Sequence, residues 1–337
     1  MSPPVPVGVV CGIGSWVPPR AVTNEELAQR LDTSDEWIRT RTGISRRHVV
    51  NPGVATSELA VQAGKRALWS SGRPDADALV LATTTPDRSC PATAPEVASR
   101  LGLTGIAAFD VAAVCTGFVY ALAAGTGLIS SGIARRVLVI GADAFTTILD
   151  PQDRTTTAIF GDGAGAVVLR AGAPEEPGAI GPFDLGSDGE LADLVAVAAG
   201  GSRQRSTGGP TAEADHYFRM DGKAVFRQAV LRMAESAQRV LERSGWRIED
   251  VDRFVAHQAN ARILASVAAR LDLDETRVVR NIDRVGNTAA GSVPLALADA
   301  VADGVIRPGH RVLLSAFGGG LTWGSTVLRW PDCAPVS

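Results

Sequence analysis

The chain has 337 residues, and 45% of them are hydrophobic. A chain of this length forms one large domain or two fused domains and can bury a sizeable core without disulfides or metals. Its 36 acidic and 33 basic residues give a net charge of −3, which argues against a nucleic-acid-binding protein.

The cysteines and the N-terminal segment indicate a reducing compartment. The four cysteines stand at 11, 90, 115 and 333 and form neither a CxxC pair nor a cluster with histidine. The sequence therefore predicts no zinc site and no disulfide framework. The N-terminal MSPPVPVGVV lacks the basic segment and the long apolar run of a signal peptide. No run of about 18 apolar residues is free of glycine or polar breaks, so we expect a cytoplasmic protein without membrane contact.

Short apolar segments alternate with stretches of helical periodicity along the chain. This alternation favours an α/β protein whose sheets are covered by helices on both faces. The strands are expected at 79–82, 106–113, 137–141, 253–256, 277–281 and 311–315. The segment 116–132 is apolar or small on every side, which predicts a helix buried all round, between two sheets.

Segments of the first half of the chain resemble segments of the second half in the same order. We interpret this order as an ancient duplication, with halves at 1–172 and 173–337. The Gly- and Pro-rich region 171–215 joins the halves and predicts an irregular excursion over a site, the alternative being a disordered linker. The paired segments are 65–85 and 238–258, 100–103 and 270–273, 135–145 and 310–320, and 159–169 and 316–328.

Cys115 is the first candidate for chemistry. It follows an apolar strand and opens the predicted buried helix, where the positive end of the helix dipole favours a thiolate. The alternative is a small buried hydrophobic residue, as most free cysteines are. The other three cysteines have no such placement.

His257 and Asn287 are candidates from the second half. His257 ends an apolar strand, and strand ends in α/β proteins meet ligands. Asn287 lies in a turn of small residues, where an Asx turn or a helix cap is the alternative role. Aligning 117–125 with 291–299 puts Ala289 opposite Cys115. The nucleophile then comes from one half, and the other two side chains come from matching loops of the other half.

These segments together resemble β-ketoacyl-acyl carrier protein synthase III, the initiating condensing enzyme of the thiolase superfamily. The resemblance implies a thiolase-like five-layered αβαβα fold built from two duplicated halves, and a homodimer. It also implies that no cofactor and no metal ion is required. The motifs that carry it are DTSDEWIRTRTGISRRH (32–48), AAVCTGFVYAL (112–122), DRTTTAIFGDGAGAVVL (153–169), HQAN (257–260), GNTAAGS (286–292) and FGGGLTWGS (317–325).

The resemblance also implies a mechanism. Cys115 would attack an acyl-CoA thioester, and malonyl on acyl carrier protein would then lose CO₂ to give an enolate that attacks the acyl-enzyme. His257 and Asn287 would donate hydrogen bonds to the thioester oxygen as it becomes negative. The backbone amides of Cys115 and Gly319 would form the oxyanion hole for the tetrahedral intermediates.

Further residues are assigned by the same resemblance. Cys90 stands where family members carry a bulky aromatic from the neighbouring subunit, which predicts a roomier pocket and a primer larger than acetyl. Arg232, Arg239 and Arg243 fall on one side of a predicted helix. Together with Arg262 and Arg270 they could form a basic patch that binds acyl carrier protein, the alternative being a helix face that only contacts solvent. The CoA and pantetheine contacts that the resemblance implies are Trp37, Arg41, Arg154 and Asn260, and the acyl-pocket residues are Cys90, Phe160 and Phe317. Positive charge, and not the resemblance, predicts that Arg262 and Arg270 dock the acidic carrier protein.

The leading alternative is a family relative that moves the acyl group to an alcohol or amine in natural-product tailoring. The intact His257 and Asn287 favour condensation instead. A thiol hydrolase is disfavoured by the duplication, and a non-catalytic carrier-binding module by the intact Cys115. CGIGSWVP (11–18) lacks the third glycine of GxGxxG, which disfavours a dinucleotide cofactor. The primer and the pathway, fatty acid or polyketide, stay open.

Overall fold

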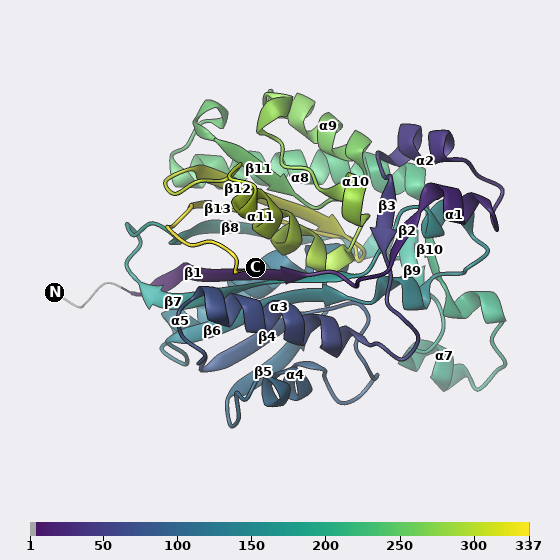
Figure 1. Cartoon of the computed structure of the whole chain (residues 1–337), viewed down its shortest axis with the longest axis horizontal. Helices are drawn as coiled ribbons and strands as arrows, with labels where there is room; N and C mark the ends of the chain where they lie inside the picture. Colours follow the sequence, from purple (N-terminus) through teal and green to yellow (C-terminus); the bar gives the residue numbers. More distant parts are fainter. Residues whose placement is uncertain (1–4, 337) are drawn as a thin grey trace.

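Two β-sheets form the centre of the computed structural model, which describes residues 5–336 (Figure 1). The first sheet has the strand order β1 (Val7–Trp16), β7 (Gly163–Gly172), β6 (Arg136–Asp143), β4 (Ala78–Ala82) and β5 (Ala107–Val111). The second has the order β11 (Arg253–Ala256), β12 (Arg311–Gly318), β13 (Thr322–Arg329) and β8 (Ile180–Ser187). The first sheet thus takes its strands from residues 7–172 and the second from residues 180–329.

Helices form three layers around these sheets. Helices α3 (Thr56–Ser70) and α4 (Ala94–Arg100) cover the outer face of the first sheet, and α8 (Gly222–Ser244) and α9 (Ala261–Arg270) cover that of the second. Helices α5 (Gly117–Ser130) and α11 (Ser292–Ala302) lie between the sheets. The five layers alternate α, β, α, β, α, as predicted. Smaller elements are α1 (Asn24–Ala28), α2 (Asp35–Thr42), α6 (Arg154–Thr157), α7 (Ser202–Thr207), α10 (Ile282–Val285), β2 (Ala21–Thr23) paired with β3 (Arg46–His48), and β9 (Val195–Val197) paired with β10 (Phe218–Met220).

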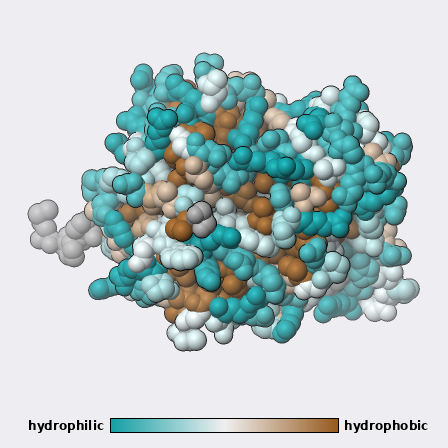
Figure 2. All heavy atoms as spheres, viewed as in Figure 1, coloured by the Kyte–Doolittle hydropathy of each residue, from teal (hydrophilic) through white to brown (hydrophobic). Residues whose placement is uncertain are grey.

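The helix that follows Cys115 lies between the sheets, as its composition predicts. Apart from Gly127, every residue of α5 is buried or half-buried. The tyrosine of α5 is also hydrogen-bonded, because the Tyr120 hydroxyl donates to the Gly186 carbonyl of β8 (2.8 Å). Figure 2 shows hydrophilic residues over most of the outer surface, with hydrophobic residues mainly toward the middle of the view. In the described part of the chain, no helix has both the length and the apolar character needed to cross a membrane.

One predicted strand is wrong. The segment 277–281 makes only an isolated parallel bridge, between Val278 and Phe254. The chain leaves the sheet on both sides of this bridge. The Arg277 side chain donates to the carbonyls of Glu249 and Val251, in the segment before β11. The Asn281 backbone amide donates to the side-chain oxygen of Gln258, just before α10 begins.

The parallel strand pair β4–β6 of the first sheet is repeated by the pair β11–β12 of the second sheet with one shift along the chain. In the first sheet Ala78 pairs in parallel with Val137, and in the second Arg253 pairs with Val312. Ala78 and Arg253 are 175 residues apart, and so are Val137 and Val312. The division at residue 172 remains our interpretation, whereas the repeated strand order is a feature of the structure.

The same shift corrects the predicted alignment of the two central turns. The 3₁₀ helix η1 (Val114–Thr116) precedes α5, and the 3₁₀ helix η7 (Ala289–Gly291) precedes α11 at the same shift. Ala290 therefore lies opposite Cys115. The sequence alignment that put Ala289 opposite Cys115 is off by one residue, because both turns consist mainly of small residues that do not fix the alignment.

The region 171–215 is more regular than the sequence predicts. It contributes β8, the edge strand of the second sheet that pairs with β13, so it is not a linker. The excursion is confined to the residues between β8 and α8, which carry η3 (Gly189–Leu194), α7, η4 (Glu213–His216) and the β9–β10 pair. Val195 and Phe218 of that pair reach the cavity described below.

Candidate active site

The three predicted catalytic residues line one buried cavity of about 50 Å³. Cys115, His257 and Asn287 are 8%, 3% and 4% exposed. The tertiary structure thus brings together side chains that lie up to 172 positions apart, from both halves of the chain. Apart from these three, the lining is apolar or glycine: Val114, Phe160, Val195, Phe218, Met220, Val225, Ala229, Met233, Ala259, Ile263, Phe317, Gly318 and Gly319.

Cys115 stands on a tight turn between β5 and α5. The preceding Val114 has φ +46°, a left-handed conformation that costs a β-branched residue on the order of 1–3 kcal/mol. Hydrogen bonds across the halves hold this turn: the Thr322 hydroxyl donates to the Ala113 carbonyl (3.2 Å), and the Thr116 hydroxyl donates to the Thr322 carbonyl (3.1 Å). Cys115 is therefore fixed against the β12–β13 turn.

The protonation of Cys115 differs from the sequence-based expectation. The helix N-terminus is present, but burial raises the pKa of the thiol well above its ordinary value, and the carboxylate of Asp143 raises it further. The sequence gives no sign of this carboxylate's proximity. The Cys115 side chain is therefore a protonated thiol at neutral pH.

His257 directly follows β11, and its backbone amide donates to the Ser315 carbonyl of β12 (2.8 Å). Burial lowers the pKa of the imidazole to about 3, so His257 is neutral at physiological pH. Its Nδ1 is buried and has no hydrogen-bond partner among residues 5–336. A neutral imidazole can donate one hydrogen bond into the cavity without bringing a charge with it.

Asn287 has the local role that the alternative interpretation predicted and also faces the cavity. Its Oδ1 accepts a hydrogen bond from the Ala289 amide (3.0 Å), which is an Asx turn. Its backbone is pinned to the segment before β7, because its amide donates to Ile159 (2.9 Å) and its carbonyl accepts from Gly161 (3.0 Å). With Oδ1 occupied, the NH₂ group is the part of Asn287 that is left to donate to a ligand.

The predicted oxyanion-hole residues lie together. Gly319 lines the cavity with Cys115. A Cβ on the neighbouring Gly318 would lie 2.8 Å from the Cys115 amide nitrogen. The space in front of that amide thus exists because residue 318 has no side chain.

The predicted CoA-contacting residues cluster on α2, α6 and the start of α9. The guanidinium groups of Arg41 and Arg154 lie 4.9 and 5.3 Å from the centre of the Trp37 ring. Asn260 caps α9 and donates to the Arg41 carbonyl (3.0 Å). Arg154 also pairs with Asp32 (3.0 Å). An aromatic face beside two guanidinium groups suits a ligand with a flat ring and phosphates.

Of the predicted acyl-pocket residues, the structure brings two to the cavity. Phe160 and Phe317 line it, and Phe160 stacks on Phe145 with ring centres 4.3 Å apart. Cys90 is exposed and does not line this cavity within one chain, so its assignment depends on a neighbouring subunit and stays a prediction. Sequence reasoning missed Phe218, which packs edge-on against both other rings, because no motif marks a side chain that arrives from a long excursion.

The predicted basic patch is smaller than the sequence indicates. Arg262 and Arg270 are exposed on α9. The stripe on α8 is not free, because its arginines pair with carboxylates of β8 and the following loop: Arg239 with Asp184 (2.9 Å), Arg243 with Asp184 (3.8 Å) and Arg232 with Asp188 (3.6 Å). Helical spacing predicts that these arginines share one face of α8, but it does not predict the carboxylates of β8 and the following loop that pair with them.

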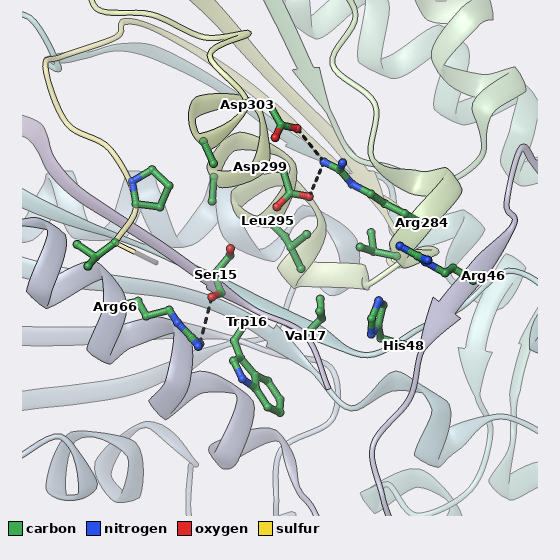
Figure 3. A pocket seen from close by; sticks show the side chains of 15 residues that line it. Ser15, Trp16, Val17, Arg46, His48, Arg66, Arg284, Leu295, Asp299 and Asp303 are labelled. Atoms are coloured by element: carbon green, nitrogen blue, oxygen red, sulfur yellow. Dashed lines mark hydrogen bonds and ion pairs between the residues drawn. The ribbon is translucent and has the colours of Figure 1, made fainter. Parts of the chain in front are cut away.

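A second, larger cavity of about 640 Å³ lies between the two halves at β1, α3, α10 and α11 (Figure 3). Arg284 crosses it to pair with Asp299 (3.1 Å) and Asp303 (3.2 Å), while Arg66 and Arg46 approach from opposite sides. None of the described residues that line this cavity is a cysteine, whereas Cys115 lines the smaller one. Among residues 5–336, no group of three His, Cys, Asp or Glu side chains could hold a metal ion.

The comparisons with known proteins agree over nearly the whole chain. The family model described as 3-oxoacyl-[acyl-carrier-protein (ACP)] synthase III matches residues 109–189, and the model of its C-terminal part matches residues 241–330. A β-ketoacyl-[acyl-carrier-protein] synthase III of Streptomyces coelicolor is 59% identical over 96% of this chain and 98% of its own. One of Pseudomonas aeruginosa is 54% identical over 97% of this chain and 98% of its own.

Solved structures confirm the predicted thiolase-like fold. The crystal structure of 3-oxoacyl-(acyl carrier protein) synthase III from Pseudomonas aeruginosa matches with a TM-score of 0.91 and 52% identity, over 98% of this chain and 100% of that one. The priming β-ketosynthase of the R1128 polyketide pathway matches with a TM-score of 0.91 and 34% identity, over 98% of both chains. The resemblance first carried by a few motifs therefore extends to sequence and fold alike, and the chain belongs to the 3-oxoacyl-[acyl-carrier-protein] synthase III family.

Proposed function

We propose that this chain catalyses an initiating decarboxylative Claisen condensation of an acyl-CoA primer with malonyl-acyl carrier protein. The products are β-ketoacyl-acyl carrier protein, CO₂ and CoA. One observation carries the proposal: Cys115, neutral His257 and Asn287 are the only polar side chains that line the buried cavity in the described chain. A nucleophile with two neutral hydrogen-bond donors suits acyl transfer followed by enolate formation.

In the first half-reaction the Cys115 sulfur attacks the thioester carbonyl carbon of the primer. A carbon–sulfur bond forms to the enzyme, the bond to the CoA sulfur breaks, and the thiol proton leaves with CoA. The developing sulfur charge lies at the N-terminus of α5, whose dipole stabilises it. The amides of Cys115 and Gly319 receive the tetrahedral oxyanion.

In the second half-reaction the bond between the malonyl methylene and its carboxylate breaks, and CO₂ leaves. The electron pair moves to the thioester oxygen, where His257 and Asn287 donate hydrogen bonds to the enolate. Because no cation lines the cavity, nothing there compensates the malonyl carboxylate, which favours its loss. The enolate carbon then attacks the acyl-Cys115 carbonyl carbon, the carbon–sulfur bond to the enzyme breaks, and the released thiolate takes up a proton from solvent to restore the thiol.

The remaining assignments belong to the same proposal. Trp37, Arg41, Arg154 and Asn260 bind the CoA and pantetheine groups, and Arg262 and Arg270 dock the acidic carrier protein. A homodimer supplies Cys90 of one subunit to the acyl pocket of the other. The reaction takes place in the cytoplasm and needs no cofactor or metal ion.

Intact-mass spectrometry of enzyme and carrier tests this proposal. The enzyme is mixed with a panel of acyl-CoAs and malonyl-acyl carrier protein. We expect an acyl adduct that Cys115→Ala loses and Cys333→Ala keeps, together with β-ketoacyl-carrier as product. An adduct that leaves malonyl-carrier untouched would overturn condensation and favour transfer to an alcohol or amine.

A further inference from the structure

Asp143 is a buried carboxylate at the junction of the two halves, and the reaction described above does not use it. It is the last residue of β6 and has 0% exposure. Five hydrogen bonds converge on its two oxygens. Oδ1 accepts from Thr83 Oγ1 (3.2 Å), Thr84 N (2.7 Å), Thr85 N (3.1 Å) and Thr85 Oγ1 (3.0 Å), and Oδ2 accepts from Ala290 N (2.8 Å). Four donors come from the first half and one from the second, so this carboxylate ties the halves together.

The duplication gives Asp143 a counterpart beside the nucleophile. Asp143 ends β6 and Gly318 ends β12, and both strands have eight residues. Ala290 lies opposite Cys115, so the amide that donates to Asp143 corresponds to the Cys115 amide beside Gly318. The Ala290 amide donates to the Asp143 carboxylate. The Cys115 amide lies beside Gly318 instead, and because glycine has no side chain, the space in front of that amide is left to the substrate.

The amide that Asp143 binds belongs to the turn that orients Asn287. Ala289 donates to Asn287 Oδ1 and has φ +46°, a conformation that a residue with a Cβ adopts only when its surroundings hold it. The next residue along the chain is Ala290, whose amide is bound by Asp143. The Ala289 amide sets the orientation of the Asn287 side chain, and the hydrogen bond from Ala290 to Asp143 anchors the strained turn at the next residue.

We propose that Asp143 is a positioning residue of the condensing site, whose carboxylate anchors η7 so that Asn287 keeps its NH₂ group toward the substrate. The proposal rests on the proposed function, because it concerns the donor that stabilises the enolate. It predicts that Asp143 acts mainly on the second half-reaction, in which Asn287 takes part.

The charge of Asp143 provides a second readout. The turn around Cys115 packs against α5, η7, β12 and β13, and the residues of these elements nearest to it carry no charge. His257 faces the same cavity and is neutral. Asp143 is the charged group that bears on the thiol, and it raises the thiol pKa. Thr83 to Thr85 and Ala290, which face Asp143 itself, have no titratable side chain.

The test uses Asp143→Asn in the full chain, because asparagine keeps the size but loses the charge and places an NH₂ group or a weaker acceptor against Ala290. We expect acyl-CoA to load Cys115 with an unchanged KM, while decarboxylative condensation falls by on the order of 10²-fold. Removing the negative charge lowers the thiol pKa. At a fixed pH below the thiol pKa, more of Cys115 is then thiolate, and the rate of its alkylation by iodoacetamide should rise by about tenfold.

Asp162→Asn is the matched control. Asp162 is also 0% exposed, burial likewise raises its pKa to about 6, and it accepts from Thr146 and Val50 instead of η7. We expect Cys115 in Asp162→Asn to be alkylated at the wild-type rate. An equal rise of the alkylation rate in both variants, or wild-type condensation in Asp143→Asn, would overturn the proposal. A wild-type enzyme that forms no Cys115 adduct would instead overturn the proposed function.

If Asp143→Asn does not fold, the wild type carries the test. Burial raises the pKa of Asp143 to about 6, so the carboxylate becomes protonated below that pH. The pH profile of condensation should then show a step near pH 6 that persists in Asp162→Asn. A profile that is flat across this range, or a step that Asp162→Asn abolishes, would contradict the proposal.

Discussion

Gly318 lies so close to Cys115 that a β-carbon on Gly318 would be 2.8 Å from the Cys115 amide nitrogen. Gly318→Ala should therefore block the oxyanion hole and lower the rate of acyl-adduct formation by on the order of 10²- to 10³-fold. Time-resolved intact mass measures this rate. Gly127→Ala is the control, because Gly127 is exposed on α5 and a methyl group added there would have nothing within 4 Å. Adduct formation at the wild-type rate in Gly318→Ala would contradict this assignment.

His257 should matter for decarboxylation more than for loading. Because its pKa is lowered to about 3, the imidazole is already neutral across pH 5–8 and cannot cause an acid limb there. His257→Ala should keep the acyl adduct and lose condensation by about 10²- to 10³-fold. Separate rates for loading and condensation, measured across this pH range, check both statements. His310→Ala, which changes a histidine just before β12, should behave as the wild type, whereas an equal loss of both rates in His257→Ala would contradict the division of roles.

Trp37 should act in CoA binding alone. Its ring lies beside Arg41 and Arg154 and outside the cavity that contains Cys115. Trp37→Ala should raise the KM for acyl-CoA about tenfold and leave kcat unchanged, since the loss concerns uniform binding. Trp69→Ala, which removes a 67% exposed ring on α3, is the matched control. A fall in kcat at unchanged KM would argue against a binding role.

Cys90 tests the contribution of a second subunit. It is exposed within one chain, so only a neighbouring subunit can bring it to the acyl pocket. Cys90→Phe should reduce loading with long or branched acyl-CoAs by more than tenfold and leave acetyl-CoA nearly unaffected, because the added ring fills pocket volume. Competition between acyl-CoAs, read by adduct mass, measures this preference. An unchanged preference would remove Cys90 from the pocket.

Arg262 and Arg270 should dock the carrier protein. Both are exposed on α9 and neither has an ion-pair partner among residues 5–336. Arg262→Glu with Arg270→Glu should raise the KM for malonyl-acyl carrier protein about tenfold, more strongly at low salt, and leave the KM for acyl-CoA unchanged. Arg247→Glu, another exposed arginine of the same half, is the control. A matching rise in this control would indicate a nonspecific charge effect.

Much of the site could be predicted before the fold was known. Their local settings made Cys115, His257 and Asn287 candidates, because a turn before a buried helix and a polar residue after an apolar strand are local features, and the resemblance to a known family joined them into one catalytic set. The duplication was inferred from repeated segments, whereas the five layers were implied by the resemblance. The same local reasoning failed at 277–281, where one bridge replaces a strand, because partners from distant loops decide whether the chain stays in the sheet.

What the sequence alone determined about this protein is its α/β character, its internal repeat and its family, since these depend on residue type, periodicity and spaced motifs. Only the tertiary structure decided which groups surround the thiol. Three relationships join positions far apart in the chain. Asp143 accepts a hydrogen bond from Ala290, Ala290 lies opposite Cys115, and Phe218 of the segment between β8 and α8 packs against Phe160. The pKa of Cys115 shows the consequence: the local helix end favours a thiolate, but burial and a carboxylate from another strand raise it instead. Burial and charge proximity are properties of the packed molecule, and no stretch of sequence carries them.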